Sequence, residues 1–253
     1  RRAHGIGKAE DDAALLTIAR TLKLPAAELQ IALDSKDPAL YAGLYPVPDY
    51  APADGFTVDR AVLYAFMRQE SKFIVKAKSR AGARGLMQLM PRTASYISRD
   101  RSLHRRSGRD RLYDPELNMT LGQKYIRYLM EHKHSGPNLF KVAVAYNGGP
   151  GNLNRWSREM PVRDDPLLFI ESVPNFESRA YVEHVLTNLW IYRSRLGEET
   201  PTLDAVAAGG WPIYVSVEDE ARAERSAELR GGILAFADVG GADAGDASEA
   251  AQP

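Results

Sequence analysis

The sequence contains no cysteine, which excludes disulfide bonds, cysteine metal ligands and thiol nucleophiles together. It also has no excess charge, because 33 Lys and Arg residues balance 33 Asp and Glu residues. No whole-chain field therefore favours a nucleic acid or an anionic membrane as a partner. No apolar run approaches the roughly 20 residues that a helix needs to span a bilayer. The composition is that of a globular protein, with 44% apolar and 26% charged residues in a chain of 253.

Helical periodicity dominates the chain, and alternating strand patterns are nearly absent. We expect an all-α fold whose only strand candidate is WPIYVSV, residues 211–217. Helices are predicted in residues 9–35 with a break at Pro25, from Thr57, from Asp114 and Pro115 to Ser135 and Gly136, over 138–147, and over 175–197.

Three further segments have distinctive compositions. The Pro- and Tyr-rich residues 37–55 are expected to form a linker that packs against the fold. The Gly-, Ala- and Asp-rich composition from residue 238 onward predicts a disordered tail. The chain begins at Arg1 and not at Met, so we expect a processed or partial form in which a signal peptide would not be visible.

Glu70 is the first candidate for chemistry. Helical spacing places it on the same face as Leu63, Phe66 and Met67. A carboxylate on such a face tends to take up a proton, which would make a general acid with a pKa of about 6–7. On the helix alone the plainer alternative is favoured, namely that the helix frays near Ser71 and Glu70 faces water.

The turn that follows Glu70 changes this balance. Gly82 and Gly85 allow the backbone to approach a ligand closely, and Gln88 adds an amide between Met87 and Leu89. The turn lacks P-loop spacing and a basic clamp for phosphate. A neutral acid beside amide donors and apolar surface suits an uncharged, hydroxyl-rich ligand such as a sugar.

Three blocks of sequence resemble the soluble lytic transglycosylases. Residues 70–94, ESKFIVKAKSRAGARGLMQLMPRTA, are similar to the Glu-Ser and Gly-Leu-Met-Gln-(Leu/Ile)-Met-Pro signature of that family. Residues 145–156, AYNGGPGNLNRW, resemble its Ala-Tyr-Asn-(Ala/Gly)-Gly-Pro-Gly motif, with Gly148 where alanine is common. Residues 169–186, FIESVPNFESRAYVEHVL, resemble its Glu-Ser-(Ile/Val)-Pro block. The blocks occur in the family's order, and the resemblance covers about residues 56–197.

The resemblance implies a lysozyme-like helical domain that cleaves the MurNAc–GlcNAc β-1,4 bond of peptidoglycan without water. Glu70 would protonate the glycosidic oxygen and then act as the base while the C6 hydroxyl of the muramic acid closes a 1,6-anhydro ring. No cofactor or metal is implied. Ordinary glycosidases need two carboxyl groups, and no other Asp or Glu lies between Glu70 and Asp100. A second carboxyl group from elsewhere in the chain stays possible.

The resemblance also implies roles for individual residues. Ser79 matches a serine that lines the site, and Gln88 and Met90 match residues of the sugar groove, although Met90 is equally well explained as core. Tyr146 and Asn147 match the second motif, where the tyrosine hydrogen-bonds either Glu70 or the substrate. Glu171 matches a substrate-binding acid. We interpret Tyr181 as a packing residue whose hydroxyl could face the site.

Two polar segments have plainer explanations. Residues 98–111 carry six arginines against two aspartates, which fits a solvated loop or, alternatively, an electrostatic patch for an anionic wall polymer or a partner. His132 and His134 lack a convergent third ligand, so a metal site is not expected there.

The predicted organisation is an N-terminal helical segment and linker over residues 1–55, a catalytic domain over 56–197, and a C-terminal extension over 198–253. By analogy with long family members, the first helices could end a larger superhelical domain. The expected partner is the peptidoglycan glycan strand, not a nucleic acid, and the expected location is the periplasm or cell envelope. The alternatives are a hydrolytic muramidase on the same fold and a non-catalytic wall-binding module.

Overall fold

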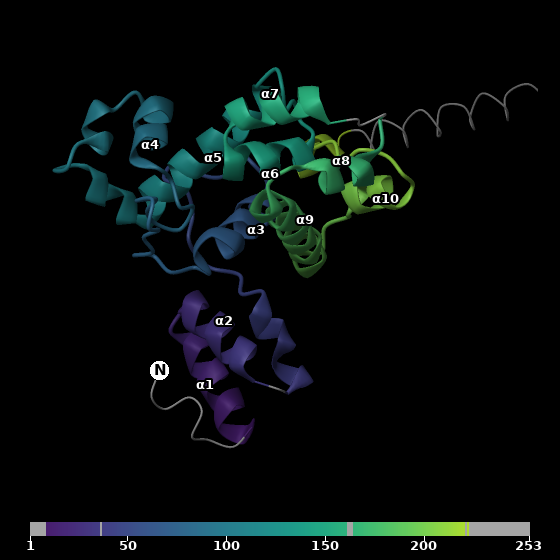
Figure 1. Ribbon diagram of the computed structural model, residues 1–253. Helices are drawn as coiled ribbons and strands as arrows, with labels where there is room; N and C mark the ends of the chain where they lie inside the picture. Colours follow the sequence, from purple (N-terminus) through teal and green to yellow (C-terminus); the bar gives the residue numbers. More distant parts are fainter. Residues whose placement is uncertain (1–8, 36, 161–163, 221, 223–253) are drawn as a thin grey trace, which may run out of the picture. The chain divides into compact units, whose positions relative to one another are not determined.

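The computed structural model describes residues 9–35, 37–160, 164–220 and 222. Within these ranges the chain forms α-helices and 3₁₀ helices and no strand, which confirms the predicted all-α class (Figure 1). The α-helices are α1 Ala9–Thr21, α2 Pro25–Asp34, α3 Arg60–Ser71, α4 Pro91–Ser98, α5 Pro115–Glu131, α6 Leu139–Gly148, α7 Pro150–Glu159, α8 Pro166–Ser172, α9 Phe176–Leu196 and α10 Pro201–Ala207. The 3₁₀ helices are η1 Pro38–Leu44, η2 Arg101–His104 and η3 Arg109–Tyr113.

The chain divides into two compact units, Arg1–Tyr214 and Val215–Pro253. The helices named above all belong to the first unit. Of the second unit, the structure describes residues 215–220 and 222, so the predicted disordered tail lies outside the described residues. Across the described ranges, no helix combines the length and apolar character needed to cross a membrane.

Helices α3 and α9 form the centre of the first unit and pack directly against each other (Figure 1). α3 is buried on nearly every side from Ala61 to Met67, since each of those residues is less than 3% exposed. At one end of the pair, the Arg193 guanidinium of α9 lies 3.0 Å from the carboxylate of Asp59. Both side chains are largely buried, so the ion pair fixes how α9 meets the start of α3.

The linker packs against this pair, as predicted. Its backbone carbonyl oxygens accept three hydrogen bonds from long side chains of α3 and α9. Leu44 accepts from Arg68 Nε at 2.8 Å, Pro48 from the Tyr64 hydroxyl at 3.1 Å, and Pro46 from the Tyr192 hydroxyl at 3.1 Å. Prolines cannot donate from their own nitrogens, so the linker is held chiefly through its carbonyl groups.

Several predicted boundaries are confirmed. α2 begins at Pro25, and Asp114 caps α5 by accepting from Leu117 N at 2.8 Å. α9 ends at Leu196 and is followed by its C-cap Gly197, in a left-handed conformation with φ of 72°. These are local signals, in which a cap, a first-turn proline or a terminal glycine decides the boundary.

Other boundaries differ from the predictions. α3 starts at Arg60, because the backbone amide of Thr57 donates to Gln123 Oε1. The Asp59 side chain pairs with Arg193 and makes no capping hydrogen bond to the helix. α5 ends at Glu131, before the expected Ser135. The strand candidate forms a single bridge between Asn138 and Ile213.

Candidate active site

Glu70 lies in the last turn of α3, which continues to Ser71 without fraying. The helix ends abruptly because Lys72 and Phe73 adopt left-handed conformations, with φ of 50° and 63°. The amide of Lys72 still donates to Arg68 O, and the Phe73 ring is anchored in the core at 1% exposure. Glu70 is thus held on the inward face of a complete helical turn, and the alternative of a frayed helix with Glu70 in water is wrong.

The environment of Glu70 favours its neutral form. Burial raises the pKa of Glu70 to about 7, the hydrogen bond from Tyr181 lowers it in part, and the negative charge of Glu177 raises it. The Tyr181 hydroxyl donates to Glu70 Oε1 at 2.5 Å. Burial also raises the pKa of Tyr181 well above 10, so this hydroxyl stays protonated and orients the carboxyl group without exchanging its proton. A carboxyl group with a pKa near 7 can give and take a proton in the same reaction.

Aromatic rings form a wall beside this carboxyl group. Tyr146 of α6 lies against Phe66, with ring centroids 4.7 Å apart, and stacks on Tyr181 at 6.5 Å with only 11° between the planes. Its hydroxyl donates to Met87 O at 2.7 Å. This bond ties α6 to the turn after α3. No described hydrogen bond joins Tyr146 to Glu70, and its contact with the substrate stays a prediction.

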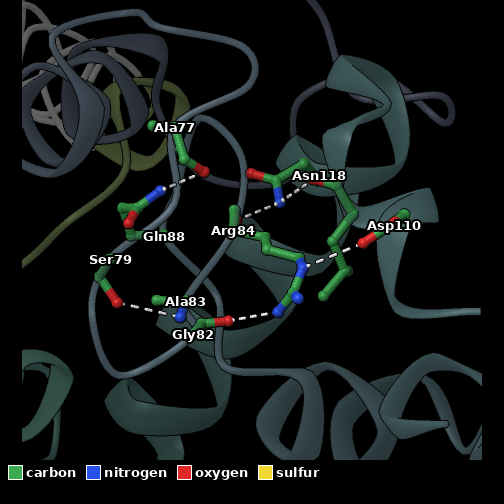
Figure 2. A network of polar contacts seen from close by, with 9 residues as sticks. Ala77, Ser79, Gly82, Ala83, Arg84, Gln88, Asp110 and Asn118 are labelled. Carbon is green, nitrogen blue, oxygen red and sulfur yellow. Dashed lines mark hydrogen bonds and ion pairs between the residues drawn. The ribbon is translucent and has the colours of Figure 1, made fainter. Parts of the chain in front are cut away.

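That turn is organised by its own polar groups (Figure 2). Ser79 Oγ accepts from the amide of Ala83 at 3.0 Å, and Arg84 Nη1 donates to Gly82 O at 2.5 Å. Ser79 is half-buried, and its side chain closes the turn by this hydrogen bond to the backbone. The side chain of Arg84 is buried and its Nε lies 3.3 Å from Asp110.

Gln88 and Met90 sit at the end of the turn. The Gln88 amide nitrogen donates to Ala77 O at 3.1 Å and to Gly85 O at 2.7 Å, as Figure 2 shows for Ala77. Its amide oxygen has no hydrogen-bond partner within the described part of the chain. Gln88 has a φ of 44°, a strained conformation of the kind that concentrates at functional sites. Met90 is 40% exposed, so the proposed groove contact fits better than a core position.

Asn118 of α5 fixes the turn to the rest of the fold (Figure 2). Its side chain is fully buried, donates to Arg84 O at 3.0 Å and Leu112 O at 2.8 Å, and accepts from Met87 N at 2.7 Å. Gly85 faces it so closely that an added Cβ would lie 2.4 Å from Asn118 Nδ2. Gly85 thus closely approaches α5, and this contact holds the turn against that helix.

The last two predicted residues lie at helix ends. Asn147, near the end of α6, accepts from the Ser178 hydroxyl of α9 at 2.7 Å, which leaves its amide nitrogen without a partner among the described residues. Glu171 of α8 is 73% exposed and lies 3.8 Å from Arg179. No described contact joins Glu171 to Glu70, so its role in substrate binding stays a prediction.

The sequence did not rank three residues as part of the site: Tyr181, Asn118 and Glu177. Tyr181 is predicted to pack in a buried helical stripe with a hydroxyl that could face the site, and the structure brings that hydroxyl to Glu70, 111 positions away. Its place in the third block was the one available signal. Asn118 offered no signal, because a buried asparagine on a helix has no characteristic spacing.

Replacing Tyr181 with phenylalanine is expected to raise the pKa of Glu70, because the lost hydrogen bond stabilises the ionised carboxylate. The alkaline limb of kcat/KM against pH should therefore move to higher pH, and activity should fall about tenfold as the carboxyl group loses its orientation. Tyr146→Phe is the matched control, since that hydroxyl bonds to Met87 and not to Glu70. A limb that stays in place for Tyr181→Phe, or moves equally in both variants, contradicts this assignment.

The comparisons with known proteins agree on one domain type. Residues 50–168 match the family model described as the transglycosylase SLT domain. Residues 50–168 are an SLT domain. The soluble lytic murein transglycosylase of Escherichia coli K12 is 36% identical over 156 residues, which is 62% of this chain and 24% of the relative.

Solved structures extend the similarity. The 70-kDa soluble lytic transglycosylase of Escherichia coli has a TM-score of 0.66 at 30% identity, and its complex with bulgecin A has a TM-score of 0.67; each match covers 77% of this chain and 32% of the solved one. An inactive Glu-to-Gln variant of the lytic transglycosylase Slt from Pseudomonas aeruginosa has a TM-score of 0.65 at 27% identity, covering 79% of this chain and 32% of that one. The lysozyme-like SLT fold is thereby confirmed. The chain spans about a quarter of the length of the curated relatives it matches and about a third of the solved chains.

Proposed function

We propose that this chain is a peptidoglycan lytic transglycosylase that cleaves the MurNAc-β-1,4-GlcNAc bond and leaves 1,6-anhydroMurNAc ends. The observation that carries the proposal is a single carboxyl group, Glu70, with a pKa of about 7, oriented by Tyr181 inside an SLT domain. The substrate is peptidoglycan, so the proposed place of action is the cell envelope, and more narrowly the periplasm.

The proposed reaction uses one carboxyl group twice, first as an acid and then as a base. Protonated Glu70 gives its proton to the glycosidic oxygen as the bond from that oxygen to C1 of the muramic acid breaks. The oxygen of the C6 hydroxyl then bonds to C1, and the ionised Glu70 takes the proton that this hydroxyl releases. The enzyme ends in its starting state and no water is consumed. Because both half-reactions need the same group, a pKa near 7 serves the acid and the base role at neutral pH.

The other predicted residues would bind the glycan around this centre. The unpartnered amide oxygen of Gln88 and amide nitrogen of Asn147 can bond sugar hydroxyl and acetamido groups. Met90 offers exposed apolar surface, while Ser79 and Tyr146 hydrogen-bond backbone groups of the turn that carries Gln88. Glu171 is proposed as a substrate contact on the resemblance alone. The catalytic domain is proposed to run over residues 56–197.

A hydrolytic muramidase is the second candidate, and Glu177 is the observation that favours it. Within the described residues this is the carboxylate whose charge acts on Glu70, and a hydrolase needs a second carboxyl group to activate water or to attack C1. Glu177 is exposed in the first turn of α9 and, within the described part of the chain, makes no bond that would hold it in such a role.

Mass spectrometry of products from defined glycan strands distinguishes the two reactions. We expect products lighter than the hydrolytic ones by one water per cut, ending in 1,6-anhydroMurNAc, for the parent enzyme and for Glu177→Gln alike. Reducing-end MurNAc from the parent enzyme would overturn the transglycosylase proposal. A product change confined to Glu177→Gln would assign water activation to Glu177.

A further inference from the structure

A pocket lies between α4 and α5, lined by residues that the proposed reaction does not use. Its volume is about 500 Å³, within the range of small-molecule sites. The polar and aromatic residues that line it are Tyr96, Arg99, Lys124, Arg127, Tyr128 and Glu131.

The charges of this α4–α5 pocket are mostly positive, although the whole chain is neutral. Arg127 lies 3.7 Å from Glu131 in a pair exposed to solvent. Arg99 and Lys124 have no carboxylate partner within the described residues. Two unpaired cations beside a weakly paired arginine favour an anionic ligand, and the planar guanidinium groups suit carboxylates in particular.

The pocket also offers aromatic surface. Tyr96 is 66% exposed and stands edge-on to Tyr128, with ring centroids 5.7 Å apart. An exposed tyrosine combines an apolar face with a hydroxyl group. The ligand that fits such a lining is amphipathic and carries negative charge.

A continuous row of tyrosines connects this pocket to Glu70. Tyr128 stacks on Tyr125 at 6.2 Å and 15°, and Tyr125 lies 5.1 Å from Tyr146. Tyr146 stacks on Tyr181, whose hydroxyl reaches Glu70. Each step is a direct side-chain contact, so the pocket and Glu70 are separated by four adjoining rings, a span that a strand of several sugars can cover.

We propose that the α4–α5 pocket binds the carboxylate-bearing peptide stem of a glycan strand whose scissile bond lies at Glu70. This inference rests on the proposed function and names a second point of contact for the same substrate. The GlcNAc units of the strand are uncharged, whereas each peptide stem carries free carboxylates. The cations of the pocket would therefore distinguish strands that retain their peptides from strands that have lost them.

The test measures binding by calorimetry in the Glu70→Gln variant, so that no turnover occurs. The probes are a disaccharide-tetrapeptide muropeptide and the neutral oligosaccharide chitotetraose. Replacing Arg99 and Lys124 together with glutamine is expected to raise the Kd of the muropeptide about tenfold. The Kd of chitotetraose should not change. The contribution of the two cations should also shrink at high salt, because both are exposed to screening.

The matched control replaces Arg105 and Arg106 with glutamine, which removes the same charge from exposed positions of the neighbouring loop outside the pocket. An equal loss of muropeptide affinity in the control would assign the effect to general charge and overturn the pocket. An unchanged muropeptide Kd in the pocket variant would do the same. If neither probe binds the protein with its pocket intact, both the proposed function and the pocket proposal fail. If chitotetraose binds but the two pocket substitutions leave the muropeptide Kd unchanged, only the pocket proposal fails.

Discussion

Glu70→Gln is expected to lower the rate of peptidoglycan cleavage by about 10²–10⁴, because removal of a general acid and base typically has an effect of that size. Glutamine has nearly the shape of the carboxyl group and can still accept the hydrogen bond from Tyr181. The groove around it should therefore remain intact. The measurement is release of soluble product from purified sacculi, with circular dichroism to verify the fold.

The same substitution should also stabilise the protein at alkaline pH. The pKa of Glu70 is about 7 in the folded state against 4.5 for the free group. The folded state therefore binds the proton more tightly, and the ionised group destabilises the fold above pH 7. Glutamine has no charge to bury, so the stability gained should be absent below about pH 4, grow between pH 4.5 and 7, and reach up to about 3 kcal/mol above that.

These two results together test the role of the carboxyl group. Denaturant titration at pH 4 and pH 8 gives the stability difference, and product release gives the activity. Product release from sacculi at the same background rate for the parent and the variant would support a non-catalytic wall-binding module instead. Loss of activity with an equal stability difference at both pH values would show that Glu70 is not buried as described, even if it is catalytic.

Gly85→Ala is expected to destabilise the fold by about 2–5 kcal/mol. A Cβ at this position would lie 2.2 Å from Leu112 O and 2.4 Å from Asn118 Nδ2, and the φ of 78° disfavours any L side chain. Overpacking of this kind costs about 1–3 kcal/mol and a left-handed conformation about 1–2 kcal/mol. The buried Asn118 side chain makes three hydrogen bonds to the backbone. Moving it to relieve the clash would therefore break those bonds.

Gly82→Ala is the matched control within the same turn. Its φ is 94°, but the nearest atom to an added Cβ is Arg84 Nη1 at 3.8 Å. It should therefore lose only about 1–2 kcal/mol, from the backbone conformation. The difference between the two variants in chemical denaturation isolates the contact with α5. Equal losses would mean that the close approach of Gly85 to Asn118 does not hold the turn.

Local signals were enough for much of the fold. A first-turn proline, an aspartate cap and a terminal glycine placed the ends of α2, α5 and α9, because each acts on neighbouring backbone groups. Where a distant partner competes, the local signal failed. Thr57 is the predicted start of α3, yet its backbone amide donates to Gln123, 66 positions away, and the helix starts at Arg60.

The same division separates what the sequence determined about the site from what only the tertiary structure decided. Helical spacing made Glu70 a candidate general acid, and three motif blocks in order associated it with glycan cleavage. Spacing and block order are both properties of the sequence. Three contacts of the site come from separate helices. The Tyr181 hydroxyl donates to Glu70, the Tyr146 hydroxyl donates to Met87, and Asn118 holds the turn. Burial and long-range hydrogen bonds depend on how those helices pack, and no spacing along the chain encodes them. That packing raises the pKa of Glu70 to about 7 and so makes a suspect carboxylate suitable for acid–base work.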